Sequence, residues 1–235
     1  MAMNVKVSST STVSAVIAAA GSSYRMKGKD KLFSEIQGTP IIVLSALAFE
    51  QNENIDEIII VSSAQKIDEI KELAKKHNIT KLSQIILGGK TRHESVLNGV
   101  KASKGGFVAI HDGARPLISQ KVINKAVFAA KEFGAAIPAV NAKDTIKLSH
   151  DGENIESTPD RSFLFNAQTP QVFNRNVYLK CVERLGIKAQ AVTDDSMIFE
   201  LCSKKVKLVK GDYKNIKITT PEDLMIAEVF LKSDL

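Results

Sequence analysis

Short apolar runs alternate with longer amphipathic segments along this chain, and this alternation restricts its fold more than any other feature. Runs typical of buried strands occupy residues 14–19, 57–61, 84–87, 107–111 and 135–140. Apolar side chains recur at every third or fourth position, as on helices, in residues 40–49, 65–77, 92–102 and 120–133. Repeated strand-helix-strand units predict an α/β fold with a mostly parallel sheet, and such sheets bind ligands outside the carboxyl ends of their strands.

The pattern changes after residue 140. Residues 141–162 are polar and turn-prone, and Asp151-Gly152 follows residues 145–148 as a hairpin signal. We therefore expect a protruding β-arm. Beyond it, the sequence predicts a short apolar run at 163–165, helices at 174–185 and 194–202, a strand at 205–209 and a last helix that starts at Pro221.

The length of 235 residues suits one domain, which we expect to span residues 13–235 behind a flexible extension of residues 1–12. No apolar run approaches the roughly 20 residues that a membrane span needs, and the first residues lack the apolar centre of a secretory signal. The two cysteines, Cys181 and Cys202, indicate neither a metal cluster nor a disulfide framework. These features favour a cytoplasmic protein with no membrane partner.

The formal net charge of +6 does not by itself indicate nucleic acid, because the lysines are spread along predicted helices and interleaved with acids. Four of the six arginines lie in predicted turns, near Gly, Asp or Pro: Arg25, Arg92, Arg115 and Arg161. A guanidinium grips phosphate with two parallel hydrogen bonds. We therefore expect phosphorylated small molecules as ligands, and no nucleic acid.

A loop of small residues follows the first predicted strand. Gly21, Ser22 and Ser23 allow backbone N–H groups to approach an anion, and Arg25 and Lys31 can add counter-charges. The segment matches neither GxxxxGK[ST] nor GxGxxG, which argues against a Walker loop and a dinucleotide fold. An ordinary lysine-rich surface loop is the alternative.

A second candidate loop, Gly88 to Ser95, joins a predicted strand to a predicted helix. Its two glycines permit the close approach of a flat ring, and the hydroxyl of Ser95 could meet the polar edge of a base. A plain turn in which Thr91 caps the helix is the alternative.

The motif His111-Asp112-Gly113-Ala114-Arg115-Pro116 closes another predicted strand. Asp112 at the carboxyl end is well placed to hold Mg²⁺ between phosphates, with Arg115 on a second phosphate. A structural ion pair between Asp112 and Arg115 is the alternative.

The last candidates lie late in the chain. The two-residue period predicts that Asn215, Lys217 and Thr219 share one face of a strand, so that Lys217 points into a polar cleft. Asp194 and Asp195 could belong to the site or could simply begin a helix.

Taken in this order, the motifs resemble the 2-C-methyl-D-erythritol 4-phosphate cytidylyltransferase family of the non-mevalonate isoprenoid pathway. The resemblance extends from Val13 to about Phe230 and rests on AAAG…RM…K, GGxxRxxSV, HDxARP, TPQxF and NIKITTPEDL. It implies a Rossmann-like nucleotidyltransferase fold whose mixed, mostly parallel sheet is flanked by helices. It also implies a homodimer clasped by the arm of residues 141–162, dependence on Mg²⁺, and reaction of CTP to a CDP-alcohol and pyrophosphate.

By matching position, the resemblance assigns phosphate contacts of the catalytic step to Arg25, Lys31 and Lys217. The CTP site would comprise Ala19, Ala20, Gly21, Ser22, Ser23, Gly89, Lys90, Ser95, Asp112 and Gly113, with Asp112 also beside the metal. The acceptor would be bound by Arg115, Thr145, Arg161, Thr169 and Thr193, with Thr145 and Arg161 reaching across the dimer. Ser23 and Gly113 replace the family's usual glycine and alanine, and we expect altered loop geometry with retained chemistry.

The mechanism implied by the resemblance is in-line attack of the acceptor's phosphate oxygen on the α-phosphorus of CTP, without a protein nucleophile. Cations then act by positioning and by electrostatic stabilisation. Two alternatives stay open: a ribitol 5-phosphate cytidylyltransferase, and a catalytically silent nucleotide-binding protein on the same scaffold.

Overall fold

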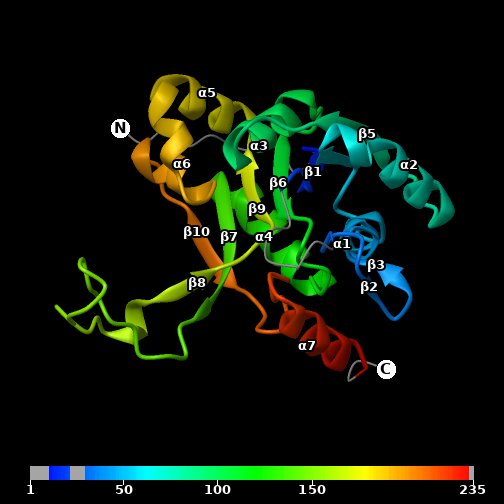
Figure 1. Cartoon of the computed structure of the whole chain (residues 1–235). Helices are drawn as coiled ribbons and strands as arrows, with labels where there is room; N and C mark the ends of the chain where they lie inside the picture. The colour runs from blue at the N-terminus through cyan, green and yellow to red at the C-terminus, as the bar shows by residue number, and fades with distance from the viewer. Residues whose placement is uncertain (1–10, 22–29, 233–235) are drawn as a thin grey trace.

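The computed structural model of this chain describes residues 11–21 and 30–232. Its centre is an eight-stranded sheet ordered β10-β7-β9-β6-β1-β4-β5, with β8 beside β7 (Figure 1). The strands are β1 (Val13–Ala18), β4 (Glu57–Ser62), β5 (Leu82–Leu87), β6 (Phe107–Asp112), β7 (Ala135–Asn141), β8 (Phe165–Ala167), β9 (Gln171–Asn174) and β10 (Lys207–Lys210). A separate hairpin pairs β2 (Glu35–Ile36) with β3 (Thr39–Pro40).

The sheet is mixed and mostly parallel, as predicted. β1 pairs in parallel with β4 and β6, β4 with β5, and β10 with β7. The antiparallel pairs involve β8 and β9. Because the chain leaves β1 toward β4 on one side and later returns to β6 on the other, the strand order reverses between β1 and β6. Such a reversal opens a crevice at the carboxyl ends of the two strands.

Helices cover both faces of the sheet. Side chains of α1 (Ile41–Glu50), α2 (Ile67–Lys76), α4 (Gln120–Phe133) and α7 (Pro221–Lys232) enter one apolar core. Those of α3 (Arg92–Ala102), α5 (Arg175–Leu185) and α6 (Ser196–Leu201) enter the other. The central strand serves both, because Ala15 and Ile17 point to the first core and Val16 to the second.

Most of the predicted elements are confirmed with shifts of one or two residues at their ends. The helices at 92–102 and 120–133 have the predicted bounds, and the helix at 65–77 begins as the short 3-10 turn η2 (Ala64–Lys66). Further 3-10 turns are η3 (Arg161–Phe163) and η4 (Gly186–Ala191). Strand β9 and the β2-β3 hairpin were not predicted.

The predicted strand at 215–219 is wrong. This segment is irregular, and its buried residues are Asn215 and Ile218 rather than alternate positions. The N–H of Ile218 donates to the carbonyl oxygen of Ala114 over 2.8 Å, and Asn215 Nδ2 donates to that of Thr169 over 2.9 Å. Isolated bonds to two different loops, instead of a ladder along one strand, explain why the two-residue period fails here.

The segment between β7 and β8 protrudes from the body (Figure 1). Its turn has Gly152 at φ +75°, as the Asp-Gly signal predicts, but strand pairing among residues 142–160 is limited to one isolated bridge between Leu148 and Ser157. The predicted strand at 145–148 is therefore not formed, and a regular β-arm stays a prediction.

Residues 1–10 of the expected extension lie outside the described residues, whereas the carbonyl oxygen of Thr12 already accepts from the N–H of Phe107 over 3.1 Å. In the described part of the chain, no helix combines the length and the apolar character that a bilayer crossing needs.

Candidate active site

A cleft of about 360 Å³ opens where the strand order reverses. β1 and β6 run side by side up to the pair Ala18 and Asp112, and both residues line the cleft. Most of its other lining comes from three loops that begin at strand ends. The lining residues are Ala18, Ala19, Ala20, Gly21, Lys31, Leu32, Gly89, Lys90, Thr91, Arg92, Ser95, Asp112, Gly113, Ala114 and Lys217.

Asp112, at the end of β6, is the centre of charge in this cleft. Its Oδ2 atom lies 2.9 Å from Lys217 Nζ and 3.6 Å from Arg115 Nε, and its Oδ1 atom lies 3.5 Å from Arg92 Nη2. Burial by itself raises the pKa of this carboxyl, but the charge of Lys217, followed by that of Arg92, outweighs burial and holds the pKa well below its usual range. Asp112 is therefore ionised and holds together a cluster of cations.

Lys217 reaches the cleft as predicted, although from an irregular segment. Its side chain keeps 39% of its surface exposed, while the flanking Asn215 and Ile218 are buried. Arg115 Nη1 donates to the carbonyl oxygen of Asn215 over 2.7 Å. The backbone around Lys217 is thus tied to the loop that follows Asp112.

The first candidate loop lies only partly within the described residues. Ala19, Ala20, Gly21 and Lys31 line the cleft, as predicted, and the N–H of Ala19 donates to Val61 O over 2.8 Å. Ser22, Ser23 and Arg25 lie outside the described residues.

Asp30 begins the described chain again after this gap. It accepts at Oδ1 from the N–H of Leu32 over 3.1 Å and forms an ion pair with Lys66. The backbone on both sides of Lys31 is thereby held in place, which directs that lysine toward the cleft.

The second candidate loop meets the first at a glycine. A Cβ atom on Gly88 would lie 2.5 Å from Cβ of Ala20 and 2.9 Å from Oγ of Ser95, so a larger residue could not stand there without moving one of the loops. Gly89, Lys90 and Ser95 line the cleft, as predicted. Gly88 therefore permits the two loops to approach each other closely.

The hydroxyl of Ser95 serves the loop itself. It accepts from the N–H of Gly89 over 3.0 Å and donates to Thr91 O over 2.9 Å. Thr91 Oγ1 caps α3 by accepting from Glu94 N over 3.1 Å, so the plain capping role considered for Thr91 is found as well. Ser95 therefore stabilises the loop that forms the cleft wall, and its O–H group points to the carbonyl oxygen of Thr91 and not into the cleft.

Thr169 lies behind Asp112 and is buried. Its Oγ1 atom accepts from the N–H of Asp112 over 3.1 Å and lies 2.9 Å from Nδ1 of His111. Nε2 of His111 lies 3.1 Å from the carbonyl oxygen of Arg115, which can only accept, so Nε2 carries the hydrogen and Nδ1 accepts from Thr169. Burial lowers the pKa of His111 to about 4, which keeps the ring neutral. These bonds fix the turn that carries Asp112 and Arg115.

The remaining predicted acceptor residues are not brought into the cleft. Thr145 and Arg161 are exposed on the protruding segment, where Arg161 Nη1 donates to Lys143 O over 3.1 Å. Thr193 is exposed and its hydroxyl lies 3.9 Å from Sδ of Met197. Within one chain, these three residues are separate from Asp112 and Lys217.

Gly113 lines the cleft directly after Asp112. Its N–H donates to Ala18 O over 3.0 Å, and an added Cβ atom would lie 3.1 Å from that same oxygen. The family's usual alanine would therefore fit only with a small shift of this loop, and the expected change in loop geometry stays a prediction.

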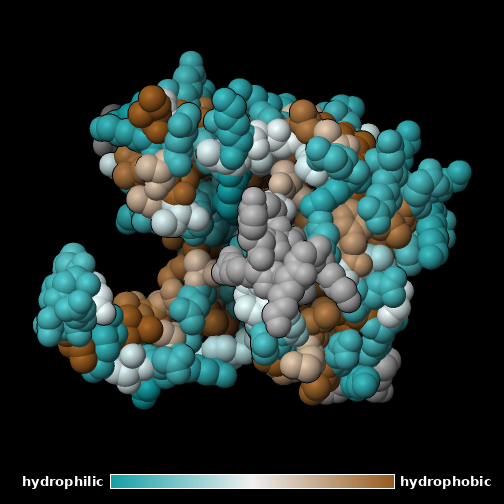
Figure 2. Space-filling view, viewed as in Figure 1, coloured by the Kyte–Doolittle hydropathy of each residue, from teal (hydrophilic) through white to brown (hydrophobic). Residues whose placement is uncertain are grey.

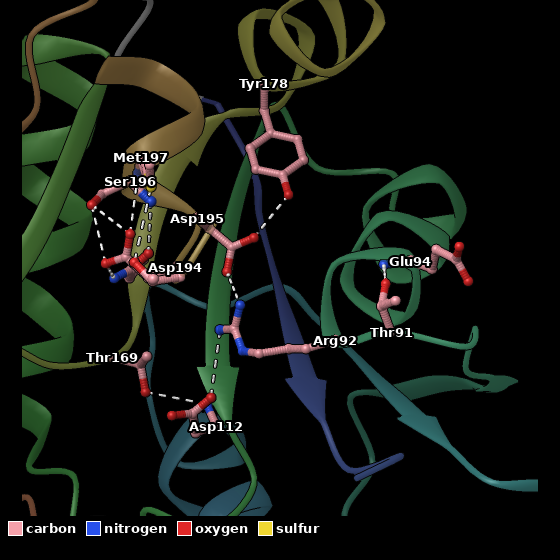
Figure 3. A network of polar contacts seen from close by, with 12 residues as sticks. Thr91, Arg92, Glu94, Asp112, Thr169, Tyr178, Asp194, Asp195, Ser196 and Met197 are labelled. Carbon is pink, nitrogen blue, oxygen red and sulfur yellow. Dashed lines mark hydrogen bonds and ion pairs between the residues drawn. The ribbon is translucent and has the colours of Figure 1, made fainter. Parts of the chain in front are cut away.

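Arg92 is a cleft residue that the sequence singled out as one of four turn arginines suited to phosphate, but that was given no specific role in the CTP or acceptor site. The first residue of α3 places its guanidinium between Asp112 and Asp195 (Figure 3). The available signal was its place in GGxxRxxSV, at the start of a helix that opens toward the cleft. The two neighbouring acids differ in role: Asp194 Oδ1 accepts from Met197 N over 3.1 Å and begins α6, whereas Asp195 is buried behind Arg92.

Together these residues form a site suited to phosphate chemistry. Four cations, from Lys31, Lys90, Arg92 and Lys217, and the backbone of two small-residue loops line a cleft that contains one carboxylate among its described residues. Cations fixed around a crevice bind a polyphosphate and stabilise the charge that develops on phosphate oxygens during transfer. No group of three or more His, Cys, Asp or Glu residues that could hold a metal ion occurs within the described ranges.

A mixed, mostly parallel sheet with a cation-lined cleft at its reversal point is the arrangement of an α/β nucleotidyltransferase. The comparisons with known proteins refine this class. The model of the 2-C-methyl-D-erythritol 4-phosphate cytidylyltransferase family matches residues 13–233, and the chain belongs to this family.

Individual relatives agree with this assignment. The chain is 45% identical over 224 residues to the 2-C-methyl-D-erythritol 4-phosphate cytidylyltransferase of Caldanaerobacter subterraneus subsp. tengcongensis, covering 94% of this chain and 99% of that protein. It is 43% identical to the enzyme of that name from a Clostridium botulinum strain, covering 93% and 97%. Among solved structures, a 4-diphosphocytidyl-2C-methyl-D-erythritol synthase from Anaerococcus prevotii aligns with TM-score 0.84 and 34% identity over 94% of this chain and 96% of that chain.

Proposed function

We propose that this chain transfers a cytidylyl group from CTP to 2-C-methyl-D-erythritol 4-phosphate, giving 4-diphosphocytidyl-2-C-methyl-D-erythritol and pyrophosphate. Family membership and the names of the relatives support this activity. The observation that carries it is the position of Lys217, whose Nζ atom lies 2.9 Å from Asp112 in a cleft that Lys31 also lines.

In the proposed reaction, an oxygen of the acceptor's phosphate forms a new bond to the α-phosphorus of CTP. The bond from that phosphorus to the bridging oxygen breaks, and the electron pair leaves with pyrophosphate. No side chain forms a covalent intermediate. Lys31 and Lys217, with Arg25 from the first loop, would bind the phosphates and stabilise the charge that accumulates on the α-phosphate oxygens.

Mg²⁺ belongs to the proposal, with Asp112 as the residue that would hold it. Mg²⁺ commonly uses one or two carboxylates and completes its coordination with substrate phosphates and water. Among the described residues, the contact of Asp112 Oδ1 is the long one, 3.5 Å, to Arg92, and with respect to these residues the oxygen keeps capacity for a further cation. When bound, the ion would neutralise charge on the triphosphate.

A homodimer also belongs to the proposal, because Thr145 and Arg161 lie on the protruding segment and outside the cleft of their own chain. Figure 2 shows hydrophobic surface on this segment and along the hollow beside it. Among its exposed apolar side chains are Ile155 at 64% and Phe163 at 79%. Burial of such a surface against a second copy of the chain would favour association, and the partner would then supply Thr145 and Arg161.

We place the protein in the cytoplasm, where its two free, buried cysteines would stay reduced.

The test of this function follows pyrophosphate release with CTP, UTP, ATP and GTP, each paired with 2-C-methyl-D-erythritol 4-phosphate or ribitol 5-phosphate. We expect turnover with CTP and the methylerythritol acceptor. Faster turnover with ribitol 5-phosphate would show that ribitol 5-phosphate, and not the methylerythritol phosphate, is the acceptor. No turnover with CTP and either acceptor would refute the function. Repeating the assay over a Mg²⁺ series with Asp112→Asn tests the metal: the variant should need more Mg²⁺ for half-maximal rate.

Sedimentation of the wild type and of Phe163→Asp tests the dimer. We expect the wild type to sediment as a dimer. The variant should already dissociate at protein concentrations at which the wild type is still dimeric, because a charge would replace an apolar side chain in the proposed contact. A monomeric wild type at assay concentrations would exclude this part of the proposal.

A further inference from the structure

A buried carboxylate stands behind the cleft without facing it. The side chain of Asp195, just before α6, has no exposed surface. An ionised group in such a place is retained only when it has hydrogen-bonding partners. Within the described part of the chain its carboxylate has two: Oδ2 accepts from Arg92 Nη1 over 2.8 Å, and Oδ1 accepts from the hydroxyl of Tyr178 over 2.9 Å (Figure 3).

Arg92 connects this buried carboxylate to the cleft. Its side chain keeps 36% of its surface exposed and it lines the cleft, whereas its contact with Asp112 is 3.5 Å long. The bond to Asp195 is much the shorter of the two. Because the guanidinium is planar and rigid, the nitrogen held by Asp195 determines where the remaining N–H groups point.

Tyr178 in turn fixes Asp195. Its ring is fully buried on α5 and packs against Phe173 at a centroid distance of 5.7 Å. Burial, together with the nearby charge of Asp195, raises the pKa of Tyr178 well above its ordinary value, so its hydroxyl keeps its proton and donates a hydrogen bond to the carboxylate. The three residues form a chain that runs from the second apolar core to the cleft.

The charge of Asp195 also affects the cations around Asp112. Asp195 balances Arg92, so that Arg92 does not depend on Asp112 for a counter-charge. Lys217 can therefore keep its 2.9 Å contact with Asp112. Without Asp195, Arg92 would be expected to move toward Asp112 and compete with Lys217.

We propose that Arg92 binds phosphate oxygens of the nucleotide, and that Asp195 and Tyr178 are positioning residues that act through Arg92. This inference rests on the proposed function, since it assigns a role in the same cleft. Arg92 uses Nη1 on Asp195 and makes only a long contact through Nη2 to Asp112, which leaves N–H capacity for a phosphate in the cleft that Arg92 lines together with Ala20 and Lys90.

The test is a double-mutant cycle on the full chain that combines Asp195→Asn or Tyr178→Phe with Arg92→Met. Titration calorimetry measures binding of CTP with Mg²⁺ and, separately, of inorganic pyrophosphate. Thermal unfolding checks that each variant is folded. Asp68→Asn, an exposed change in α2, is the matched control and should leave binding unchanged.

We expect Asp195→Asn to weaken binding about 10- to 100-fold, and Tyr178→Phe less, since loss of charge-assisted hydrogen bonds has effects of this order. In the Arg92→Met background, either change should alter binding less than about 2-fold, because residues that act through a shared partner are not additive. If Asp195→Asn does not fold, the cycle with Tyr178→Phe decides.

Equal losses in the presence and absence of Arg92, or no loss from any folded variant, would overturn the inference. The proposed function is judged separately by the wild type. If wild-type chain binds pyrophosphate but neither binds nor turns over CTP, the function fails, and the cycle measured with pyrophosphate still decides whether Asp195 positions Arg92.

Discussion

Lys217 Nζ lies 2.9 Å from Oδ2 of Asp112, and this contact joins the irregular segment before the last helix to the end of a central strand. Neither residue could form the cleft alone. Asp112 is buried with three cations around it, so the loss of any one of them changes the charge that a phosphate would meet.

Lys217→Ala should lower kcat/KM for cytidylyl transfer by about 10²- to 10³-fold, the usual effect of removing one group that stabilises developing charge. The fold should persist, because the side chain is 39% exposed. Steady-state assays with Lys205→Ala, an exposed lysine before β10, provide the comparison. Near-normal turnover of folded Lys217→Ala would remove this lysine from the mechanism.

Thr169→Val should lower the free energy of unfolding by about 1 to 3 kcal/mol, because buried hydrogen-bonding groups of Asp112 and His111 would lose their partner. Thr169→Ser keeps the hydroxyl and should stay close to the wild type. Urea unfolding measures both variants. A higher KM for the acceptor at unchanged stability would instead indicate the direct substrate contact that the family resemblance implies.

Gly99→Ala should destabilise the protein by about 1 to 3 kcal/mol although alanine is the better helix former, because overpacking outweighs propensity. A Cβ atom on Gly99 would lie 2.4 Å from Cγ1 of Val16 and 2.8 Å from Cγ2 of Val61. Lys101→Ala on the exposed face of α3 should change stability by less than about 0.5 kcal/mol. A stabilised Gly99→Ala would show that α3 can move away from the sheet.

Glu57 should make stability depend on acid pH. Burial raises the pKa of its carboxyl, but hydrogen bonds from Ser14, Lys104 and Ser83 outweigh burial and lower the pKa below 4.5. A lowered pKa in the folded state means that this stabilisation is complete above about pH 4.5 and is lost as the pH falls through the lowered value.

The stability difference between wild type and Glu57→Gln should accordingly be larger at pH 6 than at pH 3 in urea titrations. Glu53→Gln, at an exposed position, controls for general acid effects. A difference that is constant between these two pH values would contradict the assignment.

Several features could be predicted from the sequence because they depend on local periodicity and on chemistry carried within short motifs. The central strands and the long helices follow from apolar spacing, and the carboxyl-end positions of Gly89, Asp112 and Lys31 follow from the loops that end those strands. Neighbours in the chain are enough to establish these patterns.

Only the tertiary structure decided which of these residues meet. Lys217 was expected on a strand and reaches the cleft from an irregular segment. The hydroxyl of Thr169 donates to the ring of His111, and that of Ser95 donates to the backbone of its own loop. Asp195 does stand at the start of α6, as the alternative reading of the sequence has it, but its side chain does not cap the helix and instead anchors Arg92 from a fully buried position. Such choices depend on desolvation and on partners far apart in the chain, so they are set by packing and not by spacing.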